Sequence, residues 1–308
     1  MTFKFTEHTI LWQPGEMEPR APIDIDHLQS WIGNSESFTE RLAPFPSNAL
    51  AATLDRDDPP YADGTPLPPL WHWLHFLPVF KLSEAGYDGH AALGGFLPPV
   101  PLPRRMWAGS RLRFLAPMQI GRDLRKLSTV ASVSLKQGRS GDLVFLTVRH
   151  QVFDGAVQCI EEEQDIVYRE PPAPDAPAPV PQQAPEASDF SRVIHPDPVL
   201  LFRYSALTFN GHRIHYDHPF ATGSEGYDGL VVHGPILATF LLDLLRRQFP
   251  DATVDSFEFR ALAAVTGMNE FSVHGAAEPD GKTFKLWVRR HDGALSMSAT
   301  ATLAGVPA

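Results

Sequence analysis

The stretch GPILATFLLDLLRRQF, from Gly234 to Phe249, gives the strongest indication of the fold. Its apolar residues recur every three to four positions and a proline stands in its first turn, which predicts an amphipathic helix. Four segments with alternating apolar residues follow it: VDSFEFRAL, NEFSVHGAA, TFKLWVRRH and ALSMSATATL. A Pro-Asp-Gly and an Asp-Gly sequence separate the last three, as turns do between antiparallel strands. We therefore expect strands packed against one buried helix.

The first half of the chain repeats this order. An apolar stretch, LWHWLHFLPVF, begins at Leu70, and three alternating segments come after it: LRFLAPM, LVFLTVRHQVF and AVQCIEEEQDIVYRE. The segments RFLAPMQIG, ending at Gly121, and FRALAAVTG, ending at Gly267, also resemble each other, although two unrelated amphipathic strands can look this similar. A long helix followed by antiparallel strands, occurring twice, predicts an α+β architecture in which each sheet wraps one central helix.

A segment rich in proline and alanine, EPPAPDAPAPVPQQAPEA, separates the two halves. Proline at this density is incompatible with a helix or the interior of a sheet, so the segment predicts an extended linker. We therefore divide the chain into an N-terminal domain at residues 1–169, a linker at 170–187 and a C-terminal domain at 188–308.

Charge and composition exclude several classes of function. The formal net charge of −10 disfavours nucleic acid as a partner. The single cysteine, Cys159, rules out an internal disulfide framework and suits a reducing compartment. The N-terminus does not resemble a signal peptide and no run of eighteen apolar residues occurs, so we expect a cytoplasmic protein without a membrane span. The sequence contains no recognisable glycine-rich phosphate loop, so we do not expect a nucleotide-driven or redox reaction.

The loop YSALTFNGHRIHYDHPFA, from Tyr204 to Ala221, concentrates polar and titratable side chains. Functional residues gather on such loops, although histidines in a loop also simply cap or pack. His212, His215 and Asp217 offer metal-ligand atoms, but their spacing lacks the helical pair of the zinc hydrolases. We therefore predict no metal, and treat the loop as a candidate catalytic site.

This loop resembles the active-site loop of the MaoC-like family, which includes the (R)-specific enoyl-CoA hydratases and reads roughly S-G-D-x-N-P-[IL]-H-x-D. Ser205, Asn210, His215 and Asp217 take the corresponding places, with Asn210 where the family carries an aspartate. Downstream, GYDGLVVHGPI, starting at Gly226, is similar to the family's G-x-I-A-H-G-M segment that enters the central helix. The two motifs occur in the family's order and at its spacing.

In the form TFNGHRIHYD the loop resembles the double hot-dog branch of this family, which includes 3-hydroxyacyl-thioester dehydratases of mitochondrial type and mesaconyl-C4-CoA hydratases. GGFLPPVPLPRRMWAGSRLRF, at residues 94–114, resembles the N-terminal half of the same branch, so the likeness covers roughly 66–304. The resemblance implies a double hot-dog fold, two antiparallel sheets each wrapped around a central helix. It implies that the C-terminal half carries the catalytic loop and that the N-terminal half is non-catalytic.

The resemblance also assigns catalytic roles. His215 is the expected base, because imidazole exchanges protons near neutral pH. Asn210 does not titrate, so its amide oxygen is expected to orient the water. Because only one titratable group of the family's usual pair is present, our hypothesis is that His215 both activates the water and protonates the α-carbon. Gly234 falls where the family uses a backbone N–H as the oxyanion donor, at the positive end of the helix dipole.

Supporting roles fall to neighbouring residues. Asp217 is expected to orient the loop, with the acid role as its alternative, and Ser205 matches the family's serine. We expect His233 to brace the loop through a side-chain hydrogen bond. His212 is expected to face away from His215.

Four arginines are candidates for binding the substrate's anionic groups. CoA brings phosphates to an acidic protein, which requires a local basic patch, and Arg104 and Arg105 are candidates for it. A dicarboxylic acyl group would add a free carboxylate that needs a cationic partner, for which Arg213 and Arg203 are candidates.

Three functions remain open from the sequence. The leading one is a hydro-lyase that adds water to an α,β-unsaturated acyl-CoA, mesaconyl-C4-CoA or itaconyl-CoA, giving citramalyl-CoA. The first alternative is a 3-hydroxyacyl-thioester dehydratase of fatty-acid synthesis acting on an acyl-carrier-protein thioester. The second is a non-catalytic acyl-thioester-binding module. None needs a cofactor beyond the thioester itself, and a homodimer is compatible with each.

Overall fold

The computed structural model describes residues 22–138, 141–171 and 180–304. The N-terminal stretch used to judge a signal peptide and residues 172–179 of the predicted linker lie outside the described residues. The described helices are α1 (Ile25–Gln29), α2 (Pro44–Thr53), α3 (Pro198–Leu207) and α4 (Gly234–Gln248). The strands are β1 (Ser35–Arg41), β2 (Arg104–Phe114), β3 (Asp123–Gly138), β4 (Gly141–Asp154), β5 (Val157–Arg169), β6 (Phe190–Ile194), β7 (Val254–Ala261), β8 (Phe271–Ala277), β9 (Thr283–Arg290) and β10 (Leu295–Leu303).

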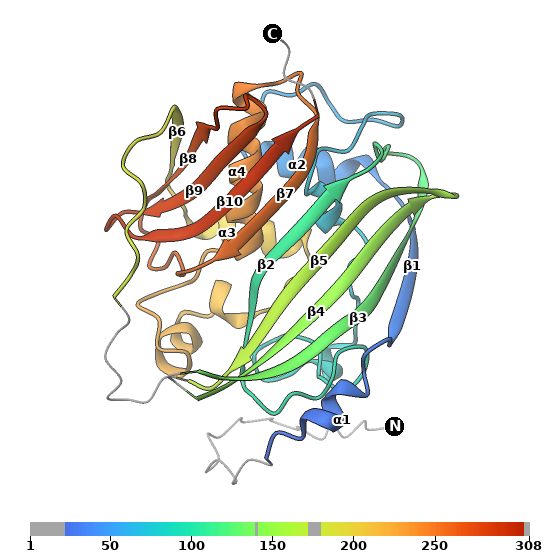
Figure 1. Ribbon diagram of the computed structural model, residues 1–308, viewed down its shortest axis with the longest axis vertical. Coiled ribbons are helices and arrows are strands. Elements are labelled where there is room, and N and C mark those ends of the chain that lie inside the picture. The colour runs from blue at the N-terminus through green and yellow to red at the C-terminus, as the bar shows by residue number, and fades with distance from the viewer. Residues whose placement is uncertain (1–21, 139–140, 172–179, 305–308) are drawn as a thin grey trace, which may run out of the picture.

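The strands form one antiparallel sheet of ten, in the order β1-β3-β4-β5-β2-β7-β10-β9-β8-β6 (Figure 1). Each half of the chain supplies five neighbouring strands, and the halves meet where β2 pairs with β7. Gly109 lies at this seam, where a Cβ would overlap the carbonyl oxygen of Phe259. Only glycine allows the two backbones to approach so closely.

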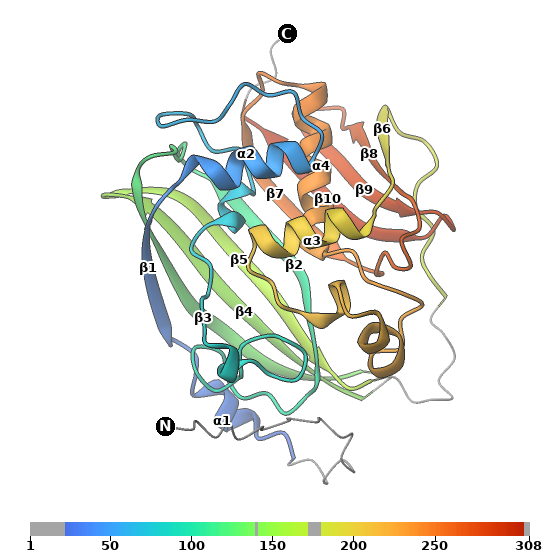
Figure 2. The ribbon, with the colours of Figure 1, turned by 180° about the vertical axis from the view of Figure 1, so that it is seen from behind.

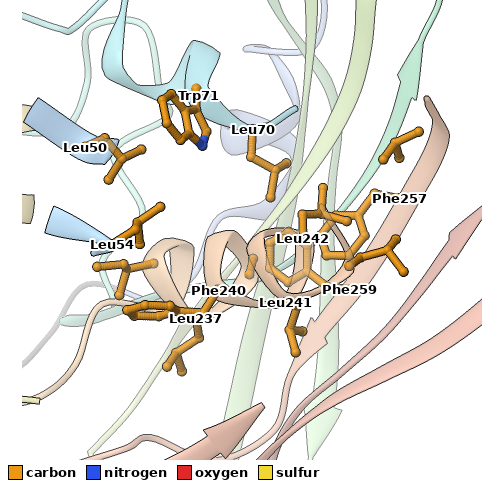
Figure 3. Packing of buried hydrophobic residues seen from close by; sticks show 14 of the residues in the cluster. Leu50, Leu54, Leu70, Trp71, Leu237, Phe240, Leu241, Leu242, Phe257 and Phe259 are labelled. Carbon is orange, nitrogen blue, oxygen red and sulfur yellow. The ribbon is translucent and has the colours of Figure 1, made fainter. Parts of the chain in front are cut away.

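Helix α4 is the buried centre of the C-terminal half. A proline at its second position suits the start of the helix, and two arginines in its last turn suit the negative end of the helix dipole. Residues 236–245 are all buried. Figure 3 shows Leu237, Phe240 and Leu241 of this helix within the core, with Phe257 and Phe259 of β7 nearby. The predicted helix and the four predicted strands after it are confirmed within two residues at each end.

No long central helix of the kind predicted occurs among the described residues of the N-terminal half. The stretch after Leu70 forms only a 3-10 helix at Trp71–Leu74, because prolines precede and follow it and Leu70 adopts a left-handed conformation with φ of 70°. A polar network lies inside this half: the buried Glu162 carboxylate bonds to the His72 ring, the Trp73 indole N–H and a serine hydroxyl. The two halves were also expected to form two separate sheets, but their described strands form one continuous sheet.

Helices α2, α3 and α4 lie on one side of the sheet (Figure 2). An ion pair between Arg56, just after α2, and Asp243 of α4 joins the two halves at 2.6 Å. No helix among the described residues has the length and apolar character needed to cross a membrane.

Candidate active site

His215 ends a 3-10 helix, Arg213–His215, in the loop between α3 and α4. Its ring is buried, and its Nδ1 lies 2.7 Å from the carbonyl oxygen of Val231. A carbonyl only accepts hydrogen bonds, so Nδ1 carries the proton and Nε2 carries the lone pair. This bond fixes the tautomer that a general base requires.

A second histidine supports the His215 ring. The His233 ring stacks on it with centroids 3.5 Å apart and planes inclined by 18°. His233 is fully buried, and its Nε2 lies 2.8 Å from the hydroxyl oxygen of Ser205 in α3. The side-chain hydrogen bond expected for His233 is thus present, and it links α3 to the residue that precedes α4.

Burial keeps His215 neutral. Removal from water, together with the nearby His212, lowers the pKa of His215 to about 3, although the hydrogen bond to Val231 acts in the opposite direction. The ring is therefore neutral at physiological pH, which is the form that accepts a proton from water.

Gly234 begins α4 three residues after Val231. Its N–H belongs to the first turn and therefore has no partner within the helix, and no other described residue accepts a hydrogen bond from it. A Cβ built on Gly234 would meet no heavy atom within 4 Å, so the space beside it is open. The geometry suits a donor to an oxyanion at the positive end of the helix.

Asn210 lies in a tight turn ahead of His215. Its Oδ1 accepts a hydrogen bond from the N–H of His212 at 2.9 Å. The preceding residue, Phe209, has a left-handed conformation with φ of 48°, an unusual conformation for a bulky side chain. The amide oxygen keeps a second lone pair, so it is able to orient a water molecule as well.

Asp217 shapes the loop. It accepts hydrogen bonds from Nε and Nη2 of Arg213 at 2.9 and 2.7 Å and from the N–H of Phe220 at 3.1 Å. These contacts match the orienting role and leave the side chain engaged within its own loop.

The prediction that His212 faces away from His215 is wrong. The two rings meet edge to face with centroids 5.5 Å apart, and on its other side the His212 ring lies 4.2 Å from the ring of His90. Asp88 holds His90 through a ring hydrogen bond of 2.8 Å. The loop carrying Asp88 and His90 belongs to the N-terminal half, and no motif in the sequence signalled its approach to the catalytic loop.

Three of the four predicted substrate-binding arginines are not free in the cavity. Arg213 pairs with Asp217 and lies over a phenylalanine ring. Arg104 pairs with Glu225. Arg203 is exposed on α3. Only Arg105 lines the cavity of about 320 Å³ that lies beside His90.

Solved structures share the fold of this chain. A MaoC-like dehydratase from Phytophthora capsici superposes with a TM-score of 0.62 at 14% identity, covering 92% of this chain and 100% of that chain. A Mycobacterium tuberculosis protein with a double hotdog fold superposes with a TM-score of 0.55 at 14% identity, covering 88% and 96%. The predicted double hot-dog fold is confirmed.

Sequence comparison places the chain in a family. The family model described as "Hydroxyacyl-thioester dehydratase type 2" matches residues 70–267. A mesaconyl-C4-CoA hydratase of Chloroflexus aurantiacus is 46% identical over 277 residues, 90% of this chain and 98% of that protein. The mitochondrial hydroxyacyl-thioester dehydratase type 2 of Schizosaccharomyces pombe is 31% identical over 252 residues, 72% of this chain and 83% of that protein. The chain belongs to the hydroxyacyl-thioester dehydratase type 2 family, and the prediction of a hydratase/dehydratase enzyme is confirmed.

Proposed function

We propose that this enzyme adds water across the double bond of mesaconyl-C4-CoA, giving citramalyl-CoA. The placement of His215 carries the proposal. Its ring is held by the carbonyl of Val231, three residues before the unpartnered N–H of Gly234, so one short segment positions both the base and the oxyanion donor. The 46% identity over almost the full length of the C. aurantiacus hydratase supports the choice of substrate.

The reaction requires one proton to move twice. Nε2 of His215 takes a proton from water, and the hydroxide adds to the β-carbon while the electrons of the double bond move to the thioester oxygen. The N–H of Gly234 stabilises the resulting enolate. The imidazolium then protonates the α-carbon, which restores neutral His215 and completes the addition of one water. Because the burial of His215 lowers its pKa, the imidazolium gives up this proton readily.

Asn210 and Asp217 assist without exchanging protons. The free lone pair of the Asn210 oxygen orients the water, and Asp217 maintains the loop through Arg213. His215 therefore performs both proton transfers of the reaction. The thioester needs no cofactor, because its carbonyl accepts the developing charge.

Product analysis on purified protein tests the proposal. Mesaconyl-C4-CoA, itaconyl-CoA and crotonyl-CoA are supplied separately, and the gain of one water is followed by mass spectrometry. We expect citramalyl-CoA from mesaconyl-C4-CoA at a rate well above that of crotonyl-CoA hydration. Turnover of crotonyl-CoA alone would instead identify a fatty-acyl dehydratase, and no turnover of any thioester would favour a binding module.

A further inference from the structure

Arg105 presents an unpaired guanidinium to the cavity beside the catalytic loop. It lies half-buried on β2 and lines the cavity together with His90, Tyr168 and apolar residues. Among the residues that the structure describes, none has a carboxylate within 4.0 Å of this guanidinium or accepts a hydrogen bond from it. Its strand neighbour Arg104, by contrast, is paired with Glu225. A cation kept unpaired at a cavity wall indicates an anionic ligand.

Tyr168 provides a second, independent sign of a polar ligand. It lies opposite Arg105 in the pairing of β2 with β5, so the two side chains share one face of the sheet. Tyr168 is 1% exposed, yet its hydroxyl has no hydrogen-bond partner. Burial raises the pKa of Tyr168, so the hydroxyl keeps its proton and is able to donate it. A buried donor without a partner is rare and calls for an acceptor in the cavity.

The same cavity lies beside the loop that carries His215. His90 lines it, and the His90 ring lies 4.2 Å from the ring of His212, whose own ring meets that of His215. The positive charge of Arg105 also reaches this group, since it lowers the pKa of both His90 and His212. The rings of His90 and His212 therefore connect His215 to the cavity that Arg105 lines.

We propose that Arg105 and Tyr168 bind the free carboxylate of a dicarboxylic acyl group and so select the substrate. The inference rests on the proposed function. In mesaconyl-C4-CoA the β-carbon that receives water also carries the free carboxylate. The guanidinium supplies two parallel N–H donors and the tyrosine a third, which matches the acceptor geometry of a carboxylate. A fatty-acyl chain would leave the half-buried guanidinium and the buried tyrosine hydroxyl without partners, so the site rejects it.

The other charged group in the cavity wall does not compete for this role. Both oxygens of Asp88 accept hydrogen bonds from His90, one from its backbone N–H at 3.0 Å and one from ring Nδ1 at 2.8 Å. Asp88, His90 and His212 also place metal-ligand atoms within 4.8 Å of one another. The internal hydrogen bonds engage both Asp88 oxygens and Nδ1 of His90, and the adjacent guanidinium repels a cation, so the chemistry favours an anion.

Matched substrates measure the contribution of Arg105. In 3-methylcrotonyl-CoA a methyl group replaces the carboxylate of mesaconyl-C4-CoA without another change. We expect Arg105→Met to lower kcat/KM for mesaconyl-C4-CoA by about 100-fold, as the loss of one partner of a partly desolvated charge pair does, and to change 3-methylcrotonyl-CoA turnover little. Tyr168→Phe should lower it by about 10-fold, the effect of one hydrogen bond. Arg113→Met serves as control, because Arg113 is an exposed arginine on the same strand.

Binding of saturated analogues separates this inference from the proposed function. Succinyl-CoA carries a carboxylate on its β-carbon and cannot be hydrated, whereas butyryl-CoA carries a methyl group there. We expect the unaltered protein to bind succinyl-CoA more tightly by calorimetry and Arg105→Met to lose this preference. A preference that Arg105→Met retains would overturn the inference even if mesaconyl-C4-CoA is hydrated. A preference that depends on Arg105 without hydration of mesaconyl-C4-CoA would keep the carboxylate site and overturn the proposed function.

Discussion

Gly89 and Gly211 bring the backbones of the two halves into contact beside His215. A Cβ built on Gly89 would overlap the carbonyl oxygen of Gly211, and the φ angle of Gly89 is 90°. Close by, the N–H of Arg213 donates to the carbonyl of Asp88 at 2.8 Å. The N-terminal half therefore positions the loop that carries His215.

Replacing Gly89 should lower activity by displacing this loop. In Gly89→Ala the new methyl group forces the two backbones apart, and we expect kcat/KM to fall by about 10-fold or more, as small misplacements of a catalytic group do. Gly64→Ala is the matched control, since Gly64 has a similar φ of 85° but no heavy atom within 4 Å of its Cβ position. Equal losses of activity in the two variants would show that conformational strain, and not the contact with Gly211, is responsible.

Removing Asp243 should destabilise the protein. Its carboxylate lies in α4 with a side chain 2% exposed, and it pairs with Arg56, Arg192 and Arg247. Asp243→Ala leaves three guanidinium groups without their shared anion, so we expect a loss of about 3–5 kcal/mol in the free energy of unfolding. Urea denaturation measures it. Asp63→Ala, which removes an exposed pair with Arg41, should cost less than about 1 kcal/mol; similar losses in both variants would refute the role of Asp243 as the buried link.

Acid should destabilise the protein well above the range in which carboxylates titrate. Burial lowers the pKa of His215 and His212 to about 3 and that of His150 to about 4, from an ordinary 6.5. Below pH 6.5 the unfolded chain binds protons at these rings and the folded chain does not, so the free energy of unfolding falls as the pH decreases from 6.5 toward 4.

Urea denaturation at pH 7.5, 6.0 and 5.0 follows this loss. Each neutral buried histidine contributes a slope of up to about 1.4 kcal/mol per pH unit. His150→Gln should reduce the slope, because it removes one such ring away from the catalytic loop. A free energy of unfolding that stays constant or rises between pH 6.5 and 5 would contradict the burial of neutral histidines.

The sequence predicted those parts of the molecule whose contacts are local. The periodicity of apolar residues predicted helix α4 and the strands after it, and a short motif predicted His215 within a polar loop. The N-terminal half was predicted less well, because β3 alternates weakly and a 3-10 helix with a polar interior replaces the expected central helix.

The long-range part of the site was not predictable from periodicity. His90 and His212 are separated by 122 positions in the chain, yet their rings are in contact. Arg105 was proposed for the CoA phosphates, and only the pairing of β2 with β5 places it beside the unpartnered hydroxyl of Tyr168. The division at residues 170–187, the cytoplasmic location and the absence of a cofactor stay predictions.

The rate of mesaconyl-C4-CoA hydration by His215→Ala tests whether this one side chain performs both proton transfers. We expect kcat to fall by about 10³-fold or more while circular dichroism stays unchanged, since general acid–base catalysis contributes up to about 10⁴-fold. Asn210→Ala, which removes the orienting amide and the hydrogen bond that it accepts from the N–H of His212, should lose far less. If His215→Ala keeps much of the hydration rate, another group activates the water and the account is wrong.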